Sequence, residues 1–241
     1  MATINFVLQG KGGVGKSLVA SLLTQHYMKR EIATICFDTD PVNKTFASYN
    51  AFNVRTIDIL NDGIICVQEF DNLVETLIEA PEDSAVIIDN GASTFLPLCA
   101  YLNDNDVVPF LEKLGHSVMF HSVVTGGQAL IDTMSGLEAL FVNFPDTPAT
   151  VWLNEYFGKT EMNGTTFSET KLCNNPKHKI HALITIAELN KHTFGYDFEN
   201  MLKKRLSFAE ALADPKFTIM TRQRLVMTWR AINEQITQAN L

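Results

Sequence analysis

A glycine-rich segment near the start of the chain has the residue types that bind phosphate. Gly10-Lys11-Gly12-Gly13-Val14-Gly15-Lys16-Ser17 matches the spacing G-x-x-x-x-G-K-[ST], in which backbone N–H groups surround phosphate oxygens. Glycines allow that close approach, the second lysine can neutralise the β and γ phosphates, and the serine hydroxyl can bind Mg²⁺. Together with Leu18, which follows directly, this loop predicts a site for a nucleoside triphosphate.

The same loop also fits a second ligand. Its first, third and sixth residues form the dinucleotide pattern G-x-G-x-x-G, and Asp38 follows where an acid that binds ribose would stand. A dinucleotide turn does not require the pair Lys16-Ser17, whereas a triphosphate site needs both a cation and a magnesium ligand. Asp89 ends another apolar run and has the form of a Walker B acid that holds Mg²⁺. The triphosphate is the favoured ligand, and a nicotinamide-dependent oxidoreductase is the alternative.

Short apolar runs alternate with helical periodicity along the chain, and these elements must position the loop. The runs cover residues 4–8, 33–37, 85–88, 118–124, 150–153 and 182–186. Strands that alternate with helices form a parallel sheet covered on both faces, and ligands bind beyond the carboxyl ends of its strands. We therefore predict the α/β class: a single P-loop NTPase domain over residues 1–241, with a mostly parallel central sheet flanked by helices on both faces.

The loop carries an additional lysine, Lys11, that an ordinary phosphate-binding loop does not need. The sequence K-G-G-V-G-K-S resembles the deviant Walker A motif of the ParA/MinD branch of P-loop ATPases, in the SIMIBI class, and Asp38-Thr39-Asp40-Pro41 resembles the switch I segment of that branch. Within the branch, the chain is most similar to TraL-type proteins of plasmid conjugal-transfer systems. The segments that carry this likeness are 7–10, 38–43, 89–93, 123–128, 151–154 and 219–225.

The resemblance implies roles for individual residues. Lys11 would reach across a two-fold interface to the nucleotide of a second subunit, so that ATP lies inside a face-to-face homodimer. A cation supplied in this way offsets charge on the transferred phosphoryl group, and Lys16 does so within the subunit. Asp40 would position or activate the attacking water, which completes the expected catalytic set. Asn154, which ends the run at 150–153, matches the asparagine that recognises adenine.

The expected magnesium ligands are Ser17, Asp38 and Asp89, with Asp38 also supporting switch I. After the Walker B acid the branch usually has Thr-Pro-Pro-Gly, whereas this chain has Asn90-Gly91-Ala92-Ser93. The TraL type shares this departure.

Composition limits the classes of partner. The chain has 241 residues, of which 46% are hydrophobic and 19% charged, and a net charge of −8. An acidic chain repels nucleic acid and anionic membranes, so any such contact would be local, as at Lys203-Lys204-Arg205. A helix over residues 221–239 is expected to pack on the sheet rather than on a membrane. No apolar stretch reaches the roughly 18 residues of a membrane span, and we expect a cytoplasmic protein, with recruitment to the inner membrane or cell pole left open.

These features predict a slow, Mg²⁺-dependent ATPase that acts as a molecular switch in plasmid conjugal transfer. The expected cofactors are ATP or ADP and Mg²⁺. The expected partners are a second copy of the chain, bound through the nucleotide face, and a protein of the conjugal-transfer machinery. The alternative is a DNA-partition or positioning ATPase that binds non-specific DNA in its ATP state.

Overall fold

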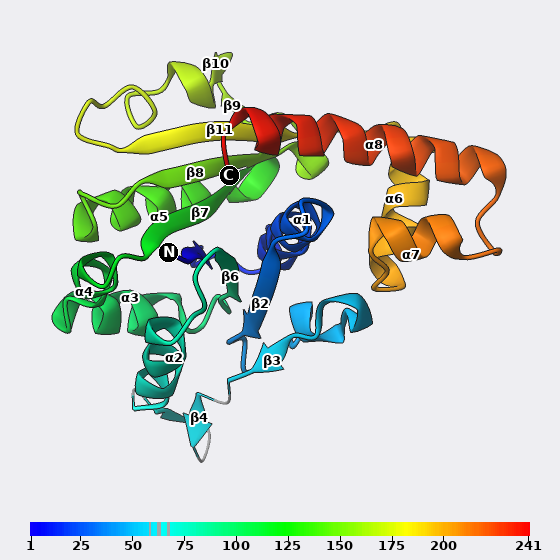
Figure 1. The fold of residues 1–241 in the computed structure, drawn as a ribbon. Coiled ribbons are helices and arrows are strands. Elements are labelled where there is room, and N and C mark those ends of the chain that lie inside the picture. The colour runs from blue at the N-terminus through cyan, green and yellow to red at the C-terminus, as the bar shows by residue number, and fades with distance from the viewer. Residues whose placement is uncertain (58, 62–63, 67) are drawn as a thin grey trace.

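A seven-stranded sheet forms the centre of the molecule. The computed structural model describes residues 1–57, 59–61, 64–66 and 68–241. The sheet has the order β11-β8-β7-β1-β6-β2-β3, and every neighbouring pair in it is parallel. Its strands are β1 (Thr3–Val7), β2 (Ala33–Asp38), β3 (Arg55–Thr56), β6 (Ser84–Asp89), β7 (Ser117–Thr125), β8 (Ala149–Asn154) and β11 (Ile180–Ile186). The predicted parallel sheet is confirmed, and each expected apolar run coincides with one of its strands, although β1 ends at Val7, one residue before the end of the first run (Figure 1).

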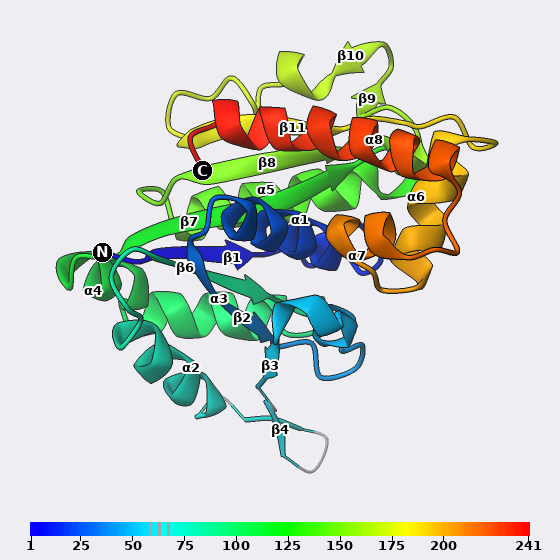
Figure 2. The same cartoon turned by 45° about the vertical axis from the view of Figure 1, so that its right-hand side comes forward.

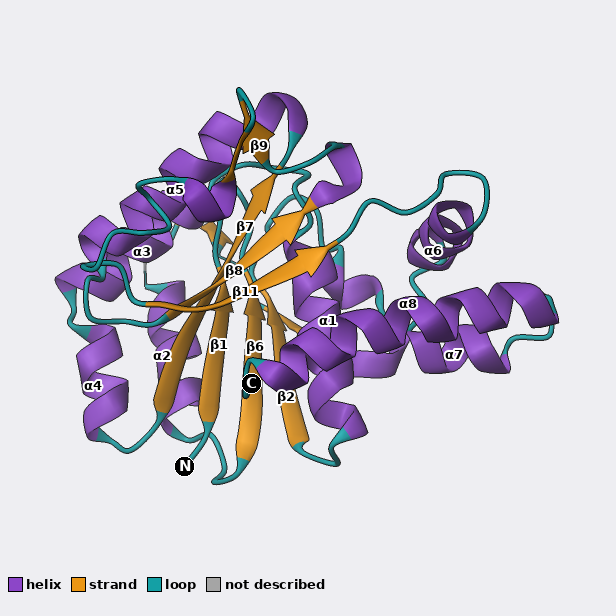
Figure 3. Cartoon of the chain, turned by 90° about the horizontal axis from the view of Figure 1, so that it is seen from above, coloured by secondary structure: helices purple, strands orange, loops and turns teal. Residues whose placement is uncertain are grey.

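Helices cover both faces of the sheet, as predicted (Figure 3). One face carries α2 (Glu69–Ile78), α3 (Phe95–Asp104), α4 (Val107–Lys113) and α5 (Leu130–Asn143), and the other carries α1 (Lys16–Lys29) and α8 (Ile219–Gln238). Strand side chains alternate between these layers: Phe6 of β1 lies in the core beneath α2–α5, and Val7 lies in the core beneath α1 and α8.

Shorter elements complete the fold. Two antiparallel pairs lie outside the main sheet, β4 (Leu60–Asn61) with β5 (Ile64–Ile65) and β9 (Glu161–Met162) with β10 (Thr165–Thr166). Single 3₁₀ turns occur at η1 (Phe46–Ser48), η2 (Asn50–Phe52), η3 (Gly127–Ala129), η4 (Glu155–Phe157) and η5 (Phe167–Glu169).

The last helix packs against the body of the protein. Leu225, Ile232 and Ile236 of α8 are buried, and α8 contacts β11, α1, α6 and α7. Trp229 stacks on Phe208 with ring centroids 5.1 Å apart. The predicted apolar stripe is therefore a packing surface, and the helix begins two residues before the expected start. Across the part of the chain that the structure describes, no helix is long and apolar enough to span a bilayer.

Helices α6 (Phe194–Lys203) and α7 (Phe208–Ala213) lie beside the N-terminal half of α8, beyond the edge of the sheet (Figures 1 and 2). We call residues 194–213 the helical arm. Arg224 Nε of α8 donates to buried Asp197 Oδ2 of α6 at 2.5 Å, and Thr221 Oγ1 donates to Asp197 Oδ1 at 3.2 Å. The backbone N–H of Phe208 donates to Gln25 Oε1 of α1 at 2.7 Å. These contacts fix the arm relative to both α8 and α1.

A buried histidine joins three central strands. Trp152 Nε1 donates to His121 Nδ1 at 3.1 Å, so His121 carries its proton on Nε2, which lies 3.0 Å from Asn5 Oδ1. Asn5 Nδ2 in turn donates to the Val86 carbonyl at 3.1 Å. Burial, with a smaller contribution from the charge of His181, lowers the pKa of His121 to about 3. The histidine is therefore neutral in the folded protein at physiological pH.

This pKa predicts a loss of stability in mild acid. In the unfolded chain this histidine binds a proton near pH 6.5, whereas in the folded protein it stays neutral down to about pH 3. The free energy of unfolding is therefore highest above pH 6.5 and decreases as the pH falls toward 3. Between pH 7 and pH 5 the loss amounts to about 2 kcal/mol. Urea unfolding across this range should show a steeper pH dependence for the wild type than for His121→Gln. Equal slopes for the two proteins would contradict the assignment.

Candidate nucleotide-binding site

The residues expected to bind nucleotide meet at one edge of the sheet. In a parallel sheet the carboxyl ends of the strands lie together, and ligands bind where the order of connections reverses. Here β1 lies between β6 and β7, and the glycine loop leaves its carboxyl end. Asp38 ends β2 and Asp89 ends β6, and the two are register partners in the parallel pairing of these strands. Asn154 ends β8 on the other side of the loop.

The loop has the conformation that its glycines predict. Gly13 and Gly15 have φ values of +74° and +110°, in the left-handed region that favours glycine. A Cβ atom on Gly15 would lie 2.8 Å from Asn154 Nδ2. Helix α1 begins directly afterwards at Lys16, so its N-terminus is turned toward the space in front of the loop, where backbone N–H groups favour an anion. Within the loop, Lys16 Nζ donates to the Lys11 carbonyl at 3.0 Å.

Hydrogen bonds hold the loop on both sides. Gln9 Nε2, just before the loop, donates to the carbonyls of Val123 and Thr133, each at 2.9 Å. Asn154 Nδ2 donates to the Val14 carbonyl at 2.8 Å. Asn154 Oδ1 accepts from the backbone N–H of Tyr156, two residues later in η4, at 3.2 Å. Asn154 therefore caps the η4 turn and supports the loop. It also lines a cavity beside the loop.

Two carboxylates lie where a magnesium ion would meet the loop. Asp89 is fully buried, and its Oδ1 has no hydrogen-bond partner among the described residues. Burial raises the pKa of Asp89 to about 8, although a hydrogen bond with Ser17 and the charge of Lys16 act in the opposite direction. A buried carboxylate oxygen without a partner beside a serine hydroxyl is an oxygen-rich site of the kind that Mg²⁺ prefers, and the ion would favour the ionised carboxylate. Ser17 and Asp89 thus fit the metal.

Asp38 has a different environment. Its Oδ1 accepts the backbone N–H of Asp40 at 3.0 Å, and its Oδ2 accepts that of Ala47 at 2.9 Å. Burial raises the pKa of Asp38, and these hydrogen bonds oppose the shift. Both oxygens therefore hold the backbone of residues 40–47, which begins in the segment that resembles switch I, and each has a further lone pair for a metal-bound water.

Switch I is in contact with the residues that follow the Walker B acid. Asn90 Oδ1 accepts from Thr39 Oγ1 at 3.0 Å and from Thr94 Oγ1 at 2.8 Å, which joins switch I to the start of α3. A Cβ atom on Gly91 would lie 2.9 Å from the Cα of Asp40. Asparagine supplies the bridging oxygen and glycine permits the close approach. These contacts give a physical reason for the departure at Asn90-Gly91-Ala92-Ser93.

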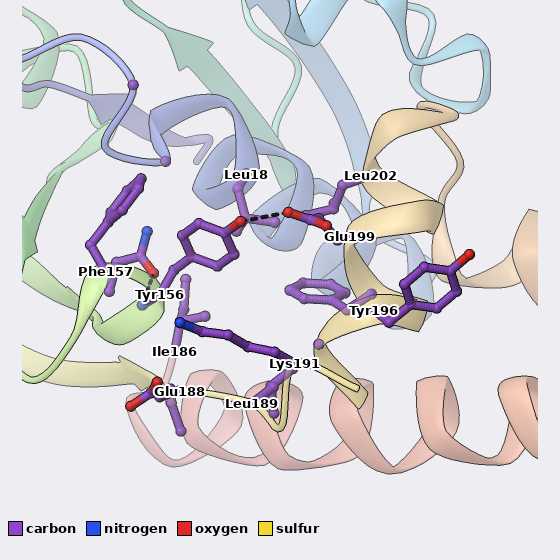
Figure 4. A pocket seen from close by; sticks show the side chains of 16 residues that line it. Leu18, Tyr156, Phe157, Ile186, Glu188, Leu189, Lys191, Tyr196, Glu199 and Leu202 are labelled. Carbon is purple, nitrogen blue, oxygen red and sulfur yellow. Dashed lines mark hydrogen bonds between the residues drawn. The ribbon is translucent and has the colours of Figure 1, made fainter. Parts of the chain in front are cut away.

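Two adjoining cavities open beside the loop. The first, of about 490 Å³, lies between Lys16, Ser17 and switch I, and includes Asp40 and Arg205 in its lining. The second, of about 360 Å³, is lined mostly by apolar groups of η4, β11 and the helical arm (Figure 4). Four residues line both cavities: Gly13, Gly15, Leu18 and Leu202. The first cavity offers the cations and the hydroxyl that phosphates require, and we call it the phosphate cavity. The second, mostly apolar cavity could accept a flat base, and we call it the base cavity.

Several lining residues carried no recognisable signal in the sequence. Tyr156 crosses the mouth of the second cavity, and its hydroxyl donates to Glu199 Oε1 of α6 at 2.5 Å (Figure 4). Leu202 of α6 and Tyr49, which follows η1, lie more than thirty residues from the loop and belong to no motif. Arg205 belongs to the basic cluster Lys203-Lys204-Arg205, which the sequence indicated only as a place for a local contact with nucleic acid or an anionic membrane.

The structure separates the three members of that cluster. Lys203 Nζ lies 3.1 Å from Glu199 Oε2 on the same helix. Lys204 Nζ lies 4.6 Å from the centroid of the Phe217 ring. Arg205 lines the phosphate cavity. Neighbours in sequence thus have three different environments.

Lys11 forms an ion pair within the chain. Its Nζ lies 2.7 Å from Asp132 Oδ2 on α5, and both side chains are about half exposed. An exposed pair of this kind contributes roughly 0–1 kcal/mol. Lys11 can therefore leave Asp132 for another anion at little cost.

Comparison with known proteins identifies relatives over the whole chain. No model of a protein family matches it. Two proteins of Escherichia coli, each named Protein TraL, are 47% and 46% identical to it over 240 residues, which cover 99% of this chain and 99% of each relative.

Among solved structures, the MinD cell division protein of Aquifex aeolicus and the MinC:MinD complex of that organism match the fold. Both have a TM-score of 0.51 and cover 95% of this chain. The MinD structure is 13% identical and is covered to 96% of its length, and the MinC:MinD complex is 14% identical and is covered to 94%. The sheet and its flanking helices thus have the fold of MinD, as the resemblance predicted. The identity over essentially the whole length shows that the chain belongs to the TraL family.

Proposed function

We propose that this protein binds ATP with Mg²⁺ and hydrolyses it slowly, as a molecular switch in plasmid conjugal transfer. The observation that carries the proposal is the pair of adjoining cavities, which share Gly13, Gly15 and Leu18, and the first of which is lined by Lys16 and Ser17. The buried carboxylate of Asp89 lies beside Ser17. A dinucleotide site has no use for a cation and a magnesium ligand at this place. The role in conjugal transfer rests on membership in the TraL family.

The residues of the site take the following roles in this proposal. Residues 10–18 surround the phosphates, and Asn154 borders the adenine. Ser17 and Asp89 hold Mg²⁺, which would neutralise charge on the phosphates, and Asp38 orients switch I and binds the ion through water. Asp40 positions the attacking water. We further propose that residues 1–241 form one folding domain, because α8 packs on both α1 and the edge strand β11.

We propose that ATP brings two copies together through the nucleotide face. Three large apolar side chains on this face are exposed: Val42 to 72%, Leu96 to 71% and Ile131 to 62%. They come from three elements that meet at the loop, namely switch I, the start of α3 and the start of α5. Two of these residues directly follow or precede a residue that contacts the loop. Phe95, next to Leu96, would lie 3.0 Å from a Cβ atom on Gly10, and Asp132, next to Ile131, forms the ion pair with Lys11. An apolar rim around an exposed lysine fits an interface that places Lys11 on the nucleotide of a second copy.

Removal of the Lys11 side chain tests this interface. With Mg²⁺ and a non-hydrolysable ATP analogue, we expect the wild type to double its mass in light scattering and Lys11→Ala to remain at the mass of one chain. Lys179→Ala is the matched control, because it also breaks an exposed lysine–aspartate pair, with Asp146, at 3.0 Å. Dimerisation of Lys11→Ala at the concentrations that suffice for Lys179→Ala would contradict the proposed role of Lys11.

The distribution of charge gives the DNA-binding alternative one supporting observation. Residues 191–230 contain eight lysines and arginines and four acidic residues, a net charge of +4, whereas the whole chain carries −8. A basic segment on an acidic protein can hold a polyanion locally. The test is an ATP-dependent, salt-sensitive shift of random DNA that is lost in the double variant Lys204→Ala, Lys216→Ala. Arg205 is left unchanged in this test because it lines the phosphate cavity.

A further inference from the structure

The first cavity has a second cation, Arg205, besides Lys16. Arg205 follows the last turn of α6 and has a φ of +55°. Its N–H donates to the Leu202 carbonyl at 3.0 Å, and the N–H of Leu206 donates to the Met201 carbonyl at 3.2 Å. This is the hydrogen-bond pattern of a Schellman helix end, in which glycine usually occupies the position that Arg205 has here. An arginine in the left-handed region costs conformational free energy that glycine would not. Glu31, at a φ of +59° after α1, has the same kind of backbone strain but lines neither of the two cavities, whereas Arg205 lines the first.

The side chain of Arg205 extends toward switch I. Burial raises the pKa of the Tyr49 hydroxyl, and the nearby positive charge of Arg205 acts in the opposite direction. Tyr49 itself is held in place, because its ring stacks on Phe52 at 5.2 Å between centroids. Tyr49 and Arg205 both line the phosphate cavity, and Lys16 and Asp40 line it as well. Arg205 thus borders the cavity from the side of the helical arm, close to Tyr49.

The backbone around Arg205 has a defined position relative to the glycine loop. Leu202, three residues earlier, lines both cavities and so places the end of α6 beside Gly13 and Leu18. The arm is tied to α8 through Asp197 and to α1 through the N–H of Phe208. Since α1 begins at Lys16, the same helix that presents the loop lysine also anchors the arm that presents Arg205.

Charge balance favours a polyanion between these two cations. A magnesium-bound triphosphate has a net charge near −2, and Lys16 neutralises one of these charges. A guanidinium binds phosphate oxygens through two parallel N–H groups, which an ammonium cannot do. Arg205 would offset part of the remaining charge from the side of the helical arm, within one chain.

We propose that Arg205 is a phosphate-binding residue of this site, which the helical arm supplies to the polyphosphate of the nucleotide bound by the same chain. The inference rests on the proposed function, because it names a further ligand-binding residue of that site. It differs from the expected action of Lys11, which operates only in a dimer.

Titration of a fluorescent ATP derivative tests the proposal. We expect Arg205→Gly to weaken binding of ATP and ADP by about 10- to 100-fold and binding of adenosine by less than 2-fold. Arg205→Lys should retain part of the affinity. Because glycine suits the backbone conformation, Arg205→Gly should unfold at the same temperature as the wild type or higher, which separates loss of binding from loss of fold.

Two variants serve as controls. Lys204→Ala removes the neighbouring cation, which contacts Phe217 outside the cavity, and Glu31→Gly relieves a left-handed residue at φ +59° after α1. Both should bind ATP like the wild type. ATP affinity of Arg205→Gly equal to that of these controls would overturn the proposal, as would an equal loss for ATP and adenosine. Failure of the wild type to bind ATP at all would instead overturn the proposed function.

Discussion

Replacement of Lys16 by alanine is expected to weaken binding of ATP by at least about 100-fold, since truncation of one partner in a desolvated charge pair costs 2–5 kcal/mol or more. Burial lowers the pKa of the Lys16 ammonium, while the carboxylates of Asp89 and Asp40 oppose that shift and favour the charged form. The cation is therefore held in a desolvated site that faces the phosphate cavity, where its attraction for phosphate is strong. Calorimetric titration with ATP in the presence of Mg²⁺ measures the effect.

A lysine at the other end of the same helix provides the control. Lys29 lies in the last turn of α1 and is exposed, so Lys29→Ala should leave ATP affinity within 2-fold of the wild type. Adenosine affinity should be similar in all three proteins, because the base cavity does not include Lys16. Unchanged affinity of Lys16→Ala for ATP would contradict the assignment of the loop to phosphate.

The second large effect concerns hydrolysis rather than binding. Asp40→Asn is expected to lower the turnover of ATP by about 10²- to 10⁴-fold, the usual contribution of a group that positions or deprotonates a nucleophile. Nucleotide affinity should change by less than about 3-fold. Asp40 Oδ1 accepts the backbone N–H groups of Val42 and Asn43 at 2.9 and 3.0 Å. An asparagine keeps this acceptor and so preserves the loop while it removes the charge.

Comparison with Asp40→Ala separates chemistry from loop structure. The alanine variant loses both the charge and the turn, so it should hydrolyse ATP as slowly as Asp40→Asn and also bind the nucleotide less well. Phosphate release under saturating ATP measures turnover in both. Wild-type turnover in Asp40→Asn together with slow turnover in Asp40→Ala would assign Asp40 a purely structural role.

The phosphate loop and the parallel sheet could be predicted because their signals are local. Gly13 and Gly15 are required by left-handed backbone, and Lys16-Ser17 must follow them for chemical reasons. Buried strands of a parallel sheet appear as continuous apolar runs, so each strand end, and with it Asp38 or Asp89, could be placed at the same edge. Features that depend on one motif or one strand can thus be predicted from the sequence.

The walls of the cavities could not be predicted, because they depend on packing between distant segments. Arg205 follows two lysines and has the same charge, and it differs from them only through the turn at the end of α6, which directs it into the phosphate cavity. Tyr156 reaches Glu199 across forty-three positions in the sequence. Asn90 departs from the pattern of the ParA/MinD branch. The hydrogen bonds that it accepts from Thr39 and Thr94 explain this residue, and they can be found only in the folded structure.

The pairing of Lys11 with Asp132 gives the proposed dimerisation a defined starting state. In a single chain the lysine is held on α5 by an exposed ion pair of small net energy. A triphosphate on a second copy carries more charge than one carboxylate and would compete effectively for the same ammonium. Dimer formation then requires the exchange of one ionic contact for another rather than a change of fold.

In the proposed function, the two adjoining cavities together hold one ATP with magnesium. Calorimetric titration of the wild type with ATP, ADP and NAD, each with and without Mg²⁺, tests it most directly. We expect one ATP bound per chain, tighter binding with Mg²⁺, and binding of NAD at least 100-fold weaker. Preferential binding of NAD, or ATP affinity that Mg²⁺ leaves unchanged, would contradict it.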